Sequence, residues 1–235
     1  MLKFFLNEAP SNVEISGNYD NSCQLLLSEK SLDSINKKSL KVKINCKRAE
    51  YTISDLIINI GTLSGKINIV VGGNGVNLVL EDNTKGNFDF RMYRNSTVKI
   101  GKNTTSNGIL LHLKDSDFIC GEDCMFSSHI LVQGSDQHGI IDLNSGEIIN
   151  KRHNRVVLGN HVWLGRQCTL TPSATIGNGS IVATGAIVTK VFPDNVLVAG
   201  LPAKVIKADC TWSRSTDNLD YYSKKIVKDH NMQIE

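Results

Sequence analysis

The chain has 235 residues, a formal net charge of +3 and an ordinary soluble composition, 40% hydrophobic and 21% charged. So small a charge does not favour nucleic acid as a partner, because nucleic-acid-binding proteins carry a clustered basic face. No run approaches the roughly 18 apolar residues of a membrane-spanning helix, and the apolar start reaches Asn7 and Glu8 too soon for a signal peptide. We therefore expect a cytoplasmic protein that does not insert into a membrane.

The cysteines do not have the spacing of a redox or zinc motif. No C-x-x-C pair is present among them. In a reducing compartment they are expected to be small buried hydrophobic residues rather than disulfides, and no metal site is predicted. They are Cys23, Cys46, Cys120, Cys124, Cys168 and Cys210.

Residues 1–90 alternate apolar and polar side chains, have few helix signals and lack a strict period. Two interpretations remain open for them, irregular additional coils of a β-helix or a small β-rich cap. We expect this β-rich N-terminal region to precede a β-helix domain over residues 91–207. Residues 208–235 are expected to form a C-terminal tail.

A six-residue spacing begins at Phe118. Side chains alternate along a strand, so residues two apart point to the same side. The spacing therefore predicts an inward row that includes two cysteines as packing residues. The residues expected to point inward are Phe118, Cys120, Cys124, Phe126, Ile130 and Val132.

Residues 134–155 interrupt this spacing. Because the blocks on either side keep the same phase, the segment is expected to loop out of the stack. Long loops on a rigid scaffold often carry function. The titratable candidates in it are Asp136, His138, Asp142, Glu147 and His153.

Six consecutive six-residue blocks fill residues 156–191. A single strand cannot hide its inner face, but stacked coils can, so the period predicts a parallel β-helix. Glycine follows the aliphatic residue in three blocks, where it is expected to adopt a positive φ at no steric cost. The third positions are Leu158, Leu164, Leu170, Ile176, Val182 and Val188, and the first are Val156, Val162, Cys168, Ala174, Ser180 and Ala186.

The repeat stops at residues 192–195, and residues 196–207 form a last extended stretch. Residues 217–229 have a moderate helical pattern. We expect this tail to cap the open end of the coil stack, as terminal units of repeat proteins do. Its predicted apolar stripe is Leu219, Tyr222, Ile226 and Val227.

Three ring side chains lie beside turns or on outward positions of the blocks. Trp163 occupies an outward position, where it serves either an interface or a ligand wall, and both interpretations stay open. His161 ends a block and is expected to be solvated or at an interface rather than catalytic. His129 ends an earlier block in the same way.

Four segments together resemble the hexapeptide-repeat, left-handed β-helix acetyltransferases. They are SDQHGIIDLNSGEIIN (135–150), VVLGNHVWLGR (156–166), IVATGAIVTK (181–190) and VLVAGLPAKVIK (196–207). Within that family the resemblance is nearest to O-acetyltransferases of bacterial capsular polysaccharides, including sialic-acid-containing capsules. It implies an all-β fold, a left-handed parallel β-helix with an extruded loop and a short C-terminal helical tail.

The resemblance also implies a function and a site. It predicts a homotrimer that transfers acetyl from acetyl-CoA, without a metal, to a hydroxyl of a capsular or other cell-surface polysaccharide. The family's catalytic histidine falls on His138, with Asp136 as a candidate orienting partner and Trp163 as a third catalytic candidate. Thr184 stands where alanine or serine is more usual. The positions implied to line the CoA site are Trp163, Arg166, Thr184, Thr189, Lys190, Lys204 and Lys207.

Two alternative functions remain open. One is an N-acetyltransferase that acts on an amino sugar nucleotide. The other is a trimeric β-helix protein that is not an acetyltransferase, such as a carbonic-anhydrase-like one. A zinc site of that kind needs three histidines that meet across a subunit boundary, and His129, His138 and His161 lack a close pair in the sequence.

Overall fold

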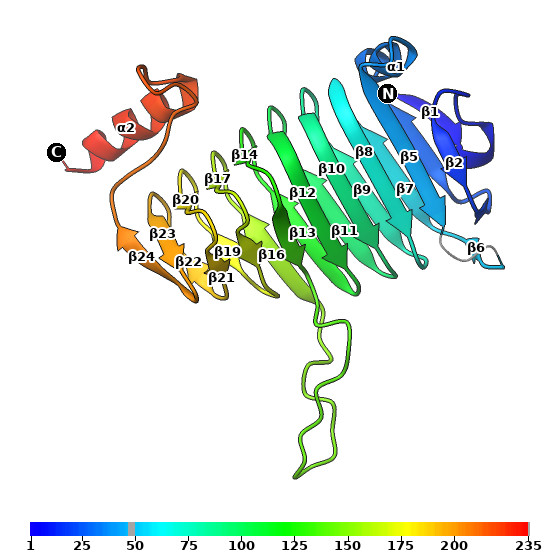
Figure 1. The fold of residues 1–235 in the computed structure, drawn as a ribbon. Coiled ribbons are helices and arrows are strands. Elements are labelled where there is room, and N and C mark those ends of the chain that lie inside the picture. Colours follow the sequence, from blue (N-terminus) through cyan, green and yellow to red (C-terminus); the bar gives the residue numbers. More distant parts are fainter. Residues whose placement is uncertain (47–49, 235) are drawn as a thin grey trace.

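The chain forms coils that stack side by side along one axis (Figure 1). Apolar and polar residues alternate along their strands, so that the apolar side chains point inward. The computed structural model describes residues 1–46 and 50–234. Each coil buries its inward side chains against the coils before and after it, and one continuous apolar core runs through the stack. This arrangement is a parallel β-helix, as the repeat predicts.

One side of the stack is a sheet whose described strands pair in parallel, except for β1 and β4 at the N-terminal edge. Its strands in spatial order are β1 (Leu2–Phe5), β4 (Gln24–Leu27), β7 (Leu56–Ile60), β9 (Val76–Leu80), β11 (Ser96–Ile100), β13 (Ser116–Cys120), β16 (Asn154–Leu158), β19 (Thr175–Ile176) and β22 (Val191–Phe192).

The second sheet divides into two branches after β12 (Thr105–Leu113), at the point where the coils change from two-sided to three-sided. Its main path is β2 (Glu14–Ser16), β5 (Leu40–Cys46), β8 (Ser64–Val71), β10 (Lys85–Met92), β12 (Thr105–Leu113), β14 (Met125–Phe126), β17 (Trp163–Leu164), β20 (Ile181–Val182), β23 (Leu197–Gly200) and β24 (Ala203–Lys207). A branch adds β15 (Ile130–Gln133), β18 (Thr169–Leu170) and β21 (Ile187–Val188). The start of β12 pairs with β14 and its end pairs with β15. One long side thus becomes two short ones, and the later coils are three-sided.

The remaining described elements lie outside these two sheets. They are η1 (Leu6–Glu8), β3 (Asn18–Tyr19), α1 (Glu29–Asn36), β6 (Thr52–Ile53) and α2 (Tyr221–Ile234). Ser28 begins α1, because its hydroxyl accepts the N–H of Ser31 at 3.0 Å. In the described part of the chain, neither α-helix has the length and apolar character needed to cross a membrane.

The inward rows predicted by the repeat are confirmed. All first and third positions of the six blocks are at most 2% exposed, as are the six residues expected to point inward in the preceding blocks. Among the described residues no cysteine forms a disulfide, and four of the six cysteines are buried. Burial raises the pKa of the Cys168 thiol to about 12, so that side chain packs as an uncharged group.

The glycines after the aliphatic residues have a different role from the expected one. Positive φ occurs instead at the last position of the blocks, for example 53° at His161 and 67° at Gly179. A Cβ at Gly165 would lie 2.6 Å from the backbone nitrogen of Thr184 in the next coil, and one at Gly159 would lie 2.7 Å from that of Asn178. These glycines are required because neighbouring coils approach too closely for any side chain.

The N-terminal region consists of coils and is continuous with the later ones. Residue 90, where the sequence pattern suggests a domain boundary, lies inside β10. This strand pairs in parallel with β8 on one side and with β12 on the other. Lys85 is opposite Ser64 in one pairing and opposite Thr105 in the other. The ladder therefore passes through this position without a break.

The C-terminal tail departs from its predicted position. It runs along a corner formed by the turns of successive coils, and β24, antiparallel to β23, closes the last coil instead (Figure 1). The helix begins at Tyr221 because the Asp220 carboxylate accepts the N–H of Ser223 at 2.8 Å. Leu219 therefore precedes the helix and is exposed, contrary to its predicted place in an apolar stripe.

Replacement of a core leucine should destabilise the whole stack. Leu164 is fully buried between Phe126 and Val182 of the adjacent coils, so Leu164→Ala should lower the free energy of unfolding by about 2–5 kcal/mol. Denaturant unfolding monitored by circular dichroism measures the change. Leu219→Ala is the matched control, since Leu219 is 49% exposed, and should stay within about 0.5 kcal/mol of the parent. Equal losses in both variants would contradict the burial described.

Candidate functional site

A long arm projects from the stack where the repeat is interrupted (Figure 1). The chain leaves the coil after Gln133, the end of β15, and returns at Asn154, the start of β16. Residues 134–153 are called the arm below. The sequence predicted a loop of 134–155, whose last two residues belong to β16.

The arm is a narrow hairpin. An antiparallel bridge joins Ile141 and Ile148, and the Ile149 N–H donates to the Ile140 carbonyl at 2.9 Å. At its tip the Asp142 carboxylate accepts the N–H groups of Ser145 and Asn144, and these bonds lower its pKa. A defined backbone thus supports the segment that carries the predicted catalytic residues.

His138 lies on the arm near its base, with its side chain exposed. Its backbone N–H donates to the Asp136 carbonyl at 2.8 Å. The carboxylate of Asp136 accepts from Asn150 Nδ2 at 2.9 Å, and that same amide nitrogen donates to the His138 carbonyl at 2.9 Å. Asn150 therefore clasps the two predicted residues together, while the His138 imidazole remains open to an incoming molecule.

Small-molecule sites commonly have volumes of about 300–1,000 Å³, and the cavity beside His138 measures ≈ 740 Å³. Arg94 in its wall pairs with Asp115 at 3.0 Å, and Lys114 Nζ donates to the Gln137 carbonyl at 3.5 Å. Its charged and titratable lining residues are Arg94, Lys114, Asp115, Asp136, His138, Lys151, Arg152 and His153.

The returning leg of the arm is held by Asp117, a residue that sequence reasoning did not identify. His153 Nε2 lies 3.1 Å from one oxygen of this nearly buried carboxylate, and Arg155 Nη2 lies 3.2 Å from the other. The brace joins β13 to β16 and fixes the angle at which the arm leaves the stack. Asp117 sits at an ordinary strand position, so only the fold reveals this contact.

Trp163 is half-buried on β17 between Met125 and Ile181 of the adjacent coils. Its indole N–H donates to the Ser127 hydroxyl at 3.4 Å, and its ring centroid lies 6.1 Å from that of Trp212 in the tail. Trp163 is absent from the lining of the cavity beside His138. Within one chain, Trp163 therefore contacts Ser127 and Trp212 and does not line the cavity that contains His138.

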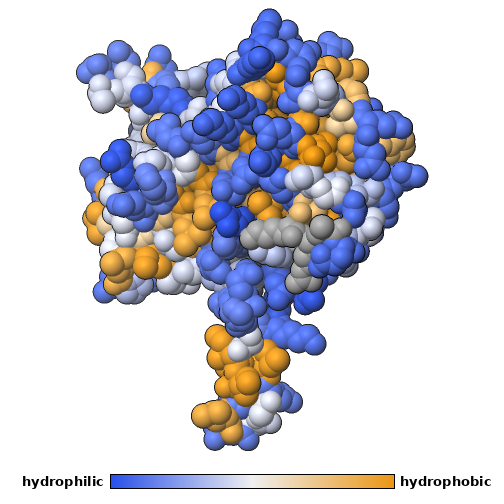
Figure 2. Space-filling view, turned by 45° about the vertical axis from the view of Figure 1, so that its right-hand side comes forward, coloured by the Kyte–Doolittle hydropathy of each residue, from blue (hydrophilic) through white to orange (hydrophobic). Residues whose placement is uncertain are grey.

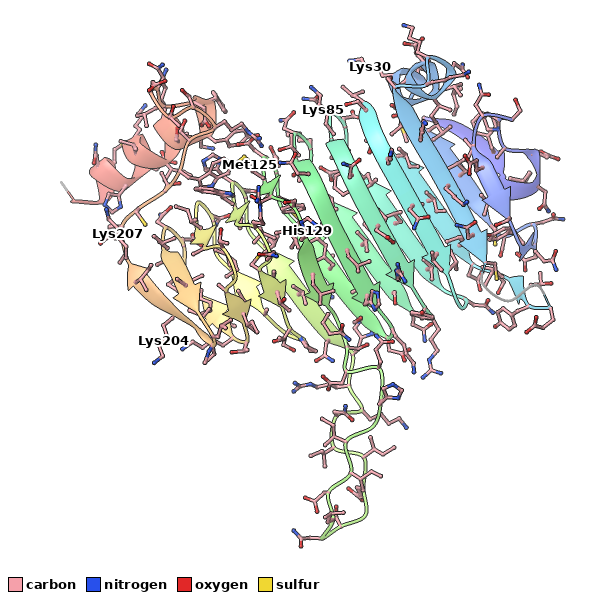
Figure 3. The ribbon with its side chains drawn as sticks, viewed as in Figure 1. Lys30, Lys85, Met125, His129, Lys204 and Lys207 are labelled. Carbon is pink, nitrogen blue, oxygen red and sulfur yellow. The ribbon has the colours of Figure 1, made fainter. Side chains whose placement is uncertain are left out.

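Apart from the half-buried Trp163, the residues predicted to bind CoA are exposed and occupy the C-terminal coils. Lys190 Nζ lies 5.5 Å from the centroid of the Phe192 ring, a cation–π contact. Lys204 and Lys207 lie at opposite ends of β24 and point away from each other (Figure 3). The exposed set comprises Arg166, Thr184, Thr189, Lys190, Lys204 and Lys207, which are spread over several coils of the single chain.

The remaining histidines differ in environment. His161 is 1% exposed beneath the tail, so the expectation of a solvated residue was wrong. His129 is exposed at the turn between β14 and β15, has a φ of 59°, and lines a groove of ≈ 630 Å³ with residues of β8, β10 and β12. Among residues 1–46 and 50–234, no group of three or more His, Cys, Asp or Glu side chains is arranged to hold a metal ion.

Comparisons with known proteins show what this chain is similar to. Residues 155–190 match a family model described as bacterial transferase hexapeptide (six repeats). The polysialic acid O-acetyltransferase of Escherichia coli O1:K1 / APEC is 30% identical over 145 residues, which are 61% of this chain and 47% of that protein. The galactoside O-acetyltransferase of Escherichia coli strain K12 is 32% identical over 114 residues, 48% of this chain and 54% of that protein. The chain thus spans about half the length of these curated relatives.

Two solved structures match the fold over almost the whole chain. The polySia-specific acetyltransferase NeuO has a TM-score of 0.73 at 24% identity, with 95% of this chain and 98% of that chain covered. The polysialic acid O-acetyltransferase OatWY has a TM-score of 0.66 at 23% identity, with 92% and 98% covered. At these identities the likeness shows the fold, and it confirms the left-handed parallel β-helix.

Removal of the Asn150 clasp should loosen the base of the arm. In Asn150→Ala the bonds to Asp136, to His138 and from the Ile140 N–H are lost, each worth about 0.5–1.5 kcal/mol. Hydrogen exchange should therefore quicken across the arm and stay unchanged in the coils. Asn144→Ala, at the exposed tip, is the control because only the backbone of Asn144 takes part in the turn. Identical exchange in the two variants would show that the clasp does not order the arm.

Proposed function

We propose that this chain, whose residues 155–190 match a hexapeptide-repeat family model within a left-handed β-helix fold, is an acetyl-CoA-dependent O-acetyltransferase. Its acceptor would be a hydroxyl of a bacterial capsular or other cell-surface polysaccharide. The observation that carries the proposal is the exposed imidazole of His138, held at the base of an ordered arm beside a charged cavity. The O-acetyltransferase relatives support the reaction class.

His138 would act as the general base. A sugar hydroxyl becomes a competent nucleophile when its proton is removed as it attacks the thioester carbon of acetyl-CoA. Imidazole suits this step because its unperturbed pKa of about 6.5 lies close to neutral pH. The proton passes from the hydroxyl to the imidazole as the bond between the hydroxyl oxygen and the acetyl carbon forms. The carbon–sulfur bond of the thioester then breaks, and the imidazolium gives its proton to the sulfur, so that CoA leaves as the thiol.

Asp136 and Asn150 would serve the base indirectly. Asn150 binds both the Asp136 carboxylate and the His138 carbonyl, so it limits the positions that the His138 ring can reach. The Asp136 carboxylate would stabilise the imidazolium that forms during the reaction. Trp163 would contribute an indole N–H or a flat wall for the cofactor, and backbone N–H groups of the coils could bind the oxyanion.

The exposed cations of the C-terminal coils suit acetyl-CoA, whose phosphates are anionic. Lys190, Lys204 and Lys207 would act as point charges, and Arg166 would bind a phosphate through its planar guanidinium. Their separation within one chain fits an extended cofactor that lies along several coils rather than in one pocket. Since acetyl-CoA is a cytoplasmic metabolite, we place the reaction in the cytoplasm.

A homotrimer would complete the site. The arm exposes five large aliphatic side chains, and Figure 2 shows them as an apolar surface on an otherwise hydrophilic projection. Such a surface is typical of an interaction site. A neighbouring chain that covers it would bring the His138 of one chain to the outer face of the coils of another. The exposed residues are Ile140, Ile141, Leu143, Ile148 and Ile149.

The charged cavity beside His138 would receive the acceptor. Arg94 is paired with Asp115, and among the described residues no ion pair is formed by the other cations of the lining, Lys114, Lys151 and Arg152. These charges favour an acceptor that carries carboxylates, such as an acidic capsular sugar. The relatives named as polysialic acid O-acetyltransferases are consistent with an acceptor of this class.

Loss of the base should abolish most of the turnover. His138→Ala should lower kcat by about 10²–10⁴-fold, because a positioned general base contributes that much to the rate. The assay measures CoA thiol released from acetyl-CoA in the presence of a panel of neutral and acidic capsular polysaccharides. His230→Ala, on α2, is the matched control and should keep full activity. Undiminished turnover in His138→Ala would show that another group is the base.

A charge on the apolar arm should break the trimer. Leu143→Asp places a carboxylate in the proposed contact, where burial of an unpaired charge is costly, so this variant should sediment as a monomer. The parent and the control Leu219→Asp, a change at an exposed tail position, should both sediment as trimers. A monomeric parent, or a trimeric Leu143→Asp variant, would contradict this role of the arm.

A further inference from the structure

A buried polar cluster joins the C-terminal tail to the coils, apart from the arm and its cavity. His161 ends the turn before β17 and is 1% exposed. Its Nδ1 lies 2.7 Å from Asp123 Oδ2, and its Nε2 lies 2.8 Å from the carbonyl oxygen of Trp212. The Trp212 indole N–H donates back to the His161 carbonyl at 2.8 Å. Two residues distant in the sequence are thus joined through both backbone and side chains.

The partners of the ring determine its protonation state. A backbone carbonyl can only accept a hydrogen bond, so His161 Nε2 must donate to Trp212. Asp123 Oδ1 accepts from Arg214 Nε at 2.9 Å, which favours the ionised carboxylate, and an ionised carboxylate can only accept. His161 Nδ1 must therefore donate as well. Both nitrogens donate only in the imidazolium form.

The rings around His161 suit a cation. Its ring is parallel to that of Trp212, with centroids 4.1 Å apart, and nearly parallel to that of Tyr222, with centroids 5.7 Å apart. A cation over the face of an aromatic ring is attracted by its electrons. The imidazolium is therefore held between two faces and two acceptors, almost entirely out of water.

Every element packed against His161 contributes charged or titratable groups. Burial opposes ionisation of Asp220, but hydrogen bonds from the N–H groups of Ser223 and Arg214, together with the positive charge of His161, lower its pKa to about 2. Burial, followed by the hydrogen bond to Glu122, raises the pKa of Tyr222. The groups are Glu122 and Asp123 from the turn after β13, Lys102 from the turn after β11, which pairs with Glu122, and Arg214, Asp220 and Tyr222 from the tail.

The cluster is connected to the proposed cofactor site through Trp212. Its ring stacks on His161 and also lies 6.1 Å from the Trp163 ring at an interplanar angle of 49°. Trp163 is half-buried, so the Trp212 ring forms part of the surface against which it rests. Displacement of the tail would remove that surface and free the Trp163 side chain.

We propose that the His161 imidazolium is a positioning residue, which latches the tail to the coils and, through Trp212, holds Trp163 in place for acetyl-CoA. The effect on acetyl-CoA rests on the proposed function of Trp163, whereas the latch does not. When the imidazolium loses a proton, one of its acceptors loses its donor in a buried place. The latched state binds a proton that the released state gives up, so the latch is stable at low pH and weakens as the pH rises.

Asp123→Asn tests the protonation argument directly. The asparagine carbonyl still accepts from Arg214, and its amide N–H would donate to an unprotonated Nδ1, so a neutral His161 would suffice. The positive φ of 53° at Asp123 suits asparagine. This variant should therefore keep the latch and lose its pH dependence.

The first measurement is hydrogen exchange of residues 211–214 in the full chain between about pH 6 and pH 9.5, a range in which an imidazolium can lose its proton. In the parent, the protection factor should fall by up to about tenfold per pH unit, the limit for release of one proton. In Asp123→Asn it should be constant, and His230→Gln should behave as the parent. A pH-independent parent, or an Asp123→Asn variant that follows the parent, would overturn the latch.

The second measurement follows Trp163 without reference to activity. Trp163 and Trp212 are the two tryptophans of the chain, so in Trp212→Phe the emission comes from Trp163 alone. The phenylalanine keeps a ring in the stack. The emission should move to longer wavelength as the pH rises and should stay constant when Asp123→Asn is added. Emission that is constant in Trp212→Phe would overturn the link to Trp163.

The third measurement is the KM for acetyl-CoA across the same pH range. In the parent, KM should rise with the loss of tail protection while kcat changes little, and in Asp123→Asn it should not rise. A KM that stays constant while the protection of the tail falls would overturn the role of the latch in acetyl-CoA binding. If the parent transfers no acetyl group, the proposed function fails, while the exchange and emission measurements still decide the latch.

Discussion

The burial of each coil against the next is the constraint on which the rest of this structure depends. A block of six residues has too few contacts to hide its own apolar side chains, so every coil is stable only through its neighbours. The fully buried rows at the first and third block positions express this dependence. Glycines such as Gly165 follow from it too, because the backbones of successive coils come too close for a Cβ. Any residue that is not needed for stacking must point outward or leave the stack.

The arm is the longest segment that leaves the stack and returns to it, and contacts within the arm and at its base stabilise it. Asn150, on the returning part of the arm, binds Asp136 and His138 on the outgoing part, and Asp117 binds His153 and Arg155 at the base. The strands before and after it keep their register, since β12 pairs with β15 and β13 pairs with β16 without a shift. A rigid scaffold therefore presents a hairpin whose apolar side chains have no cover in the single chain. That combination favours an assembly in which the arm of one chain serves its neighbour.

The C-terminal tail is attached to the coils by polar side chains. A buried carboxylate and a buried imidazole are expensive to desolvate, and they persist only where each has a partner. Here Asp123, His161 and Arg214 satisfy one another along a corner of the coils, and Trp212 covers them. The tail is attached by this network more than by apolar helix packing, since α2 leaves Val227 and Met232 exposed. Such an attachment responds to proton concentration in a way that a purely apolar contact does not.

The sequence by itself determined the inward rows, the coil repeat and the place where the arm leaves, because each depends on the period of nearby side chains. His138 was singled out by motif resemblance, and its catalytic role stays a prediction, as do the roles of Trp163 and the CoA-binding residues. Only the tertiary structure decided that residues before 90 join the same ladder, that Asp117 braces the arm, and that His161 is buried by the tail. These features join residues distant in the chain, and their local patterns do not differ from those of an ordinary strand or turn.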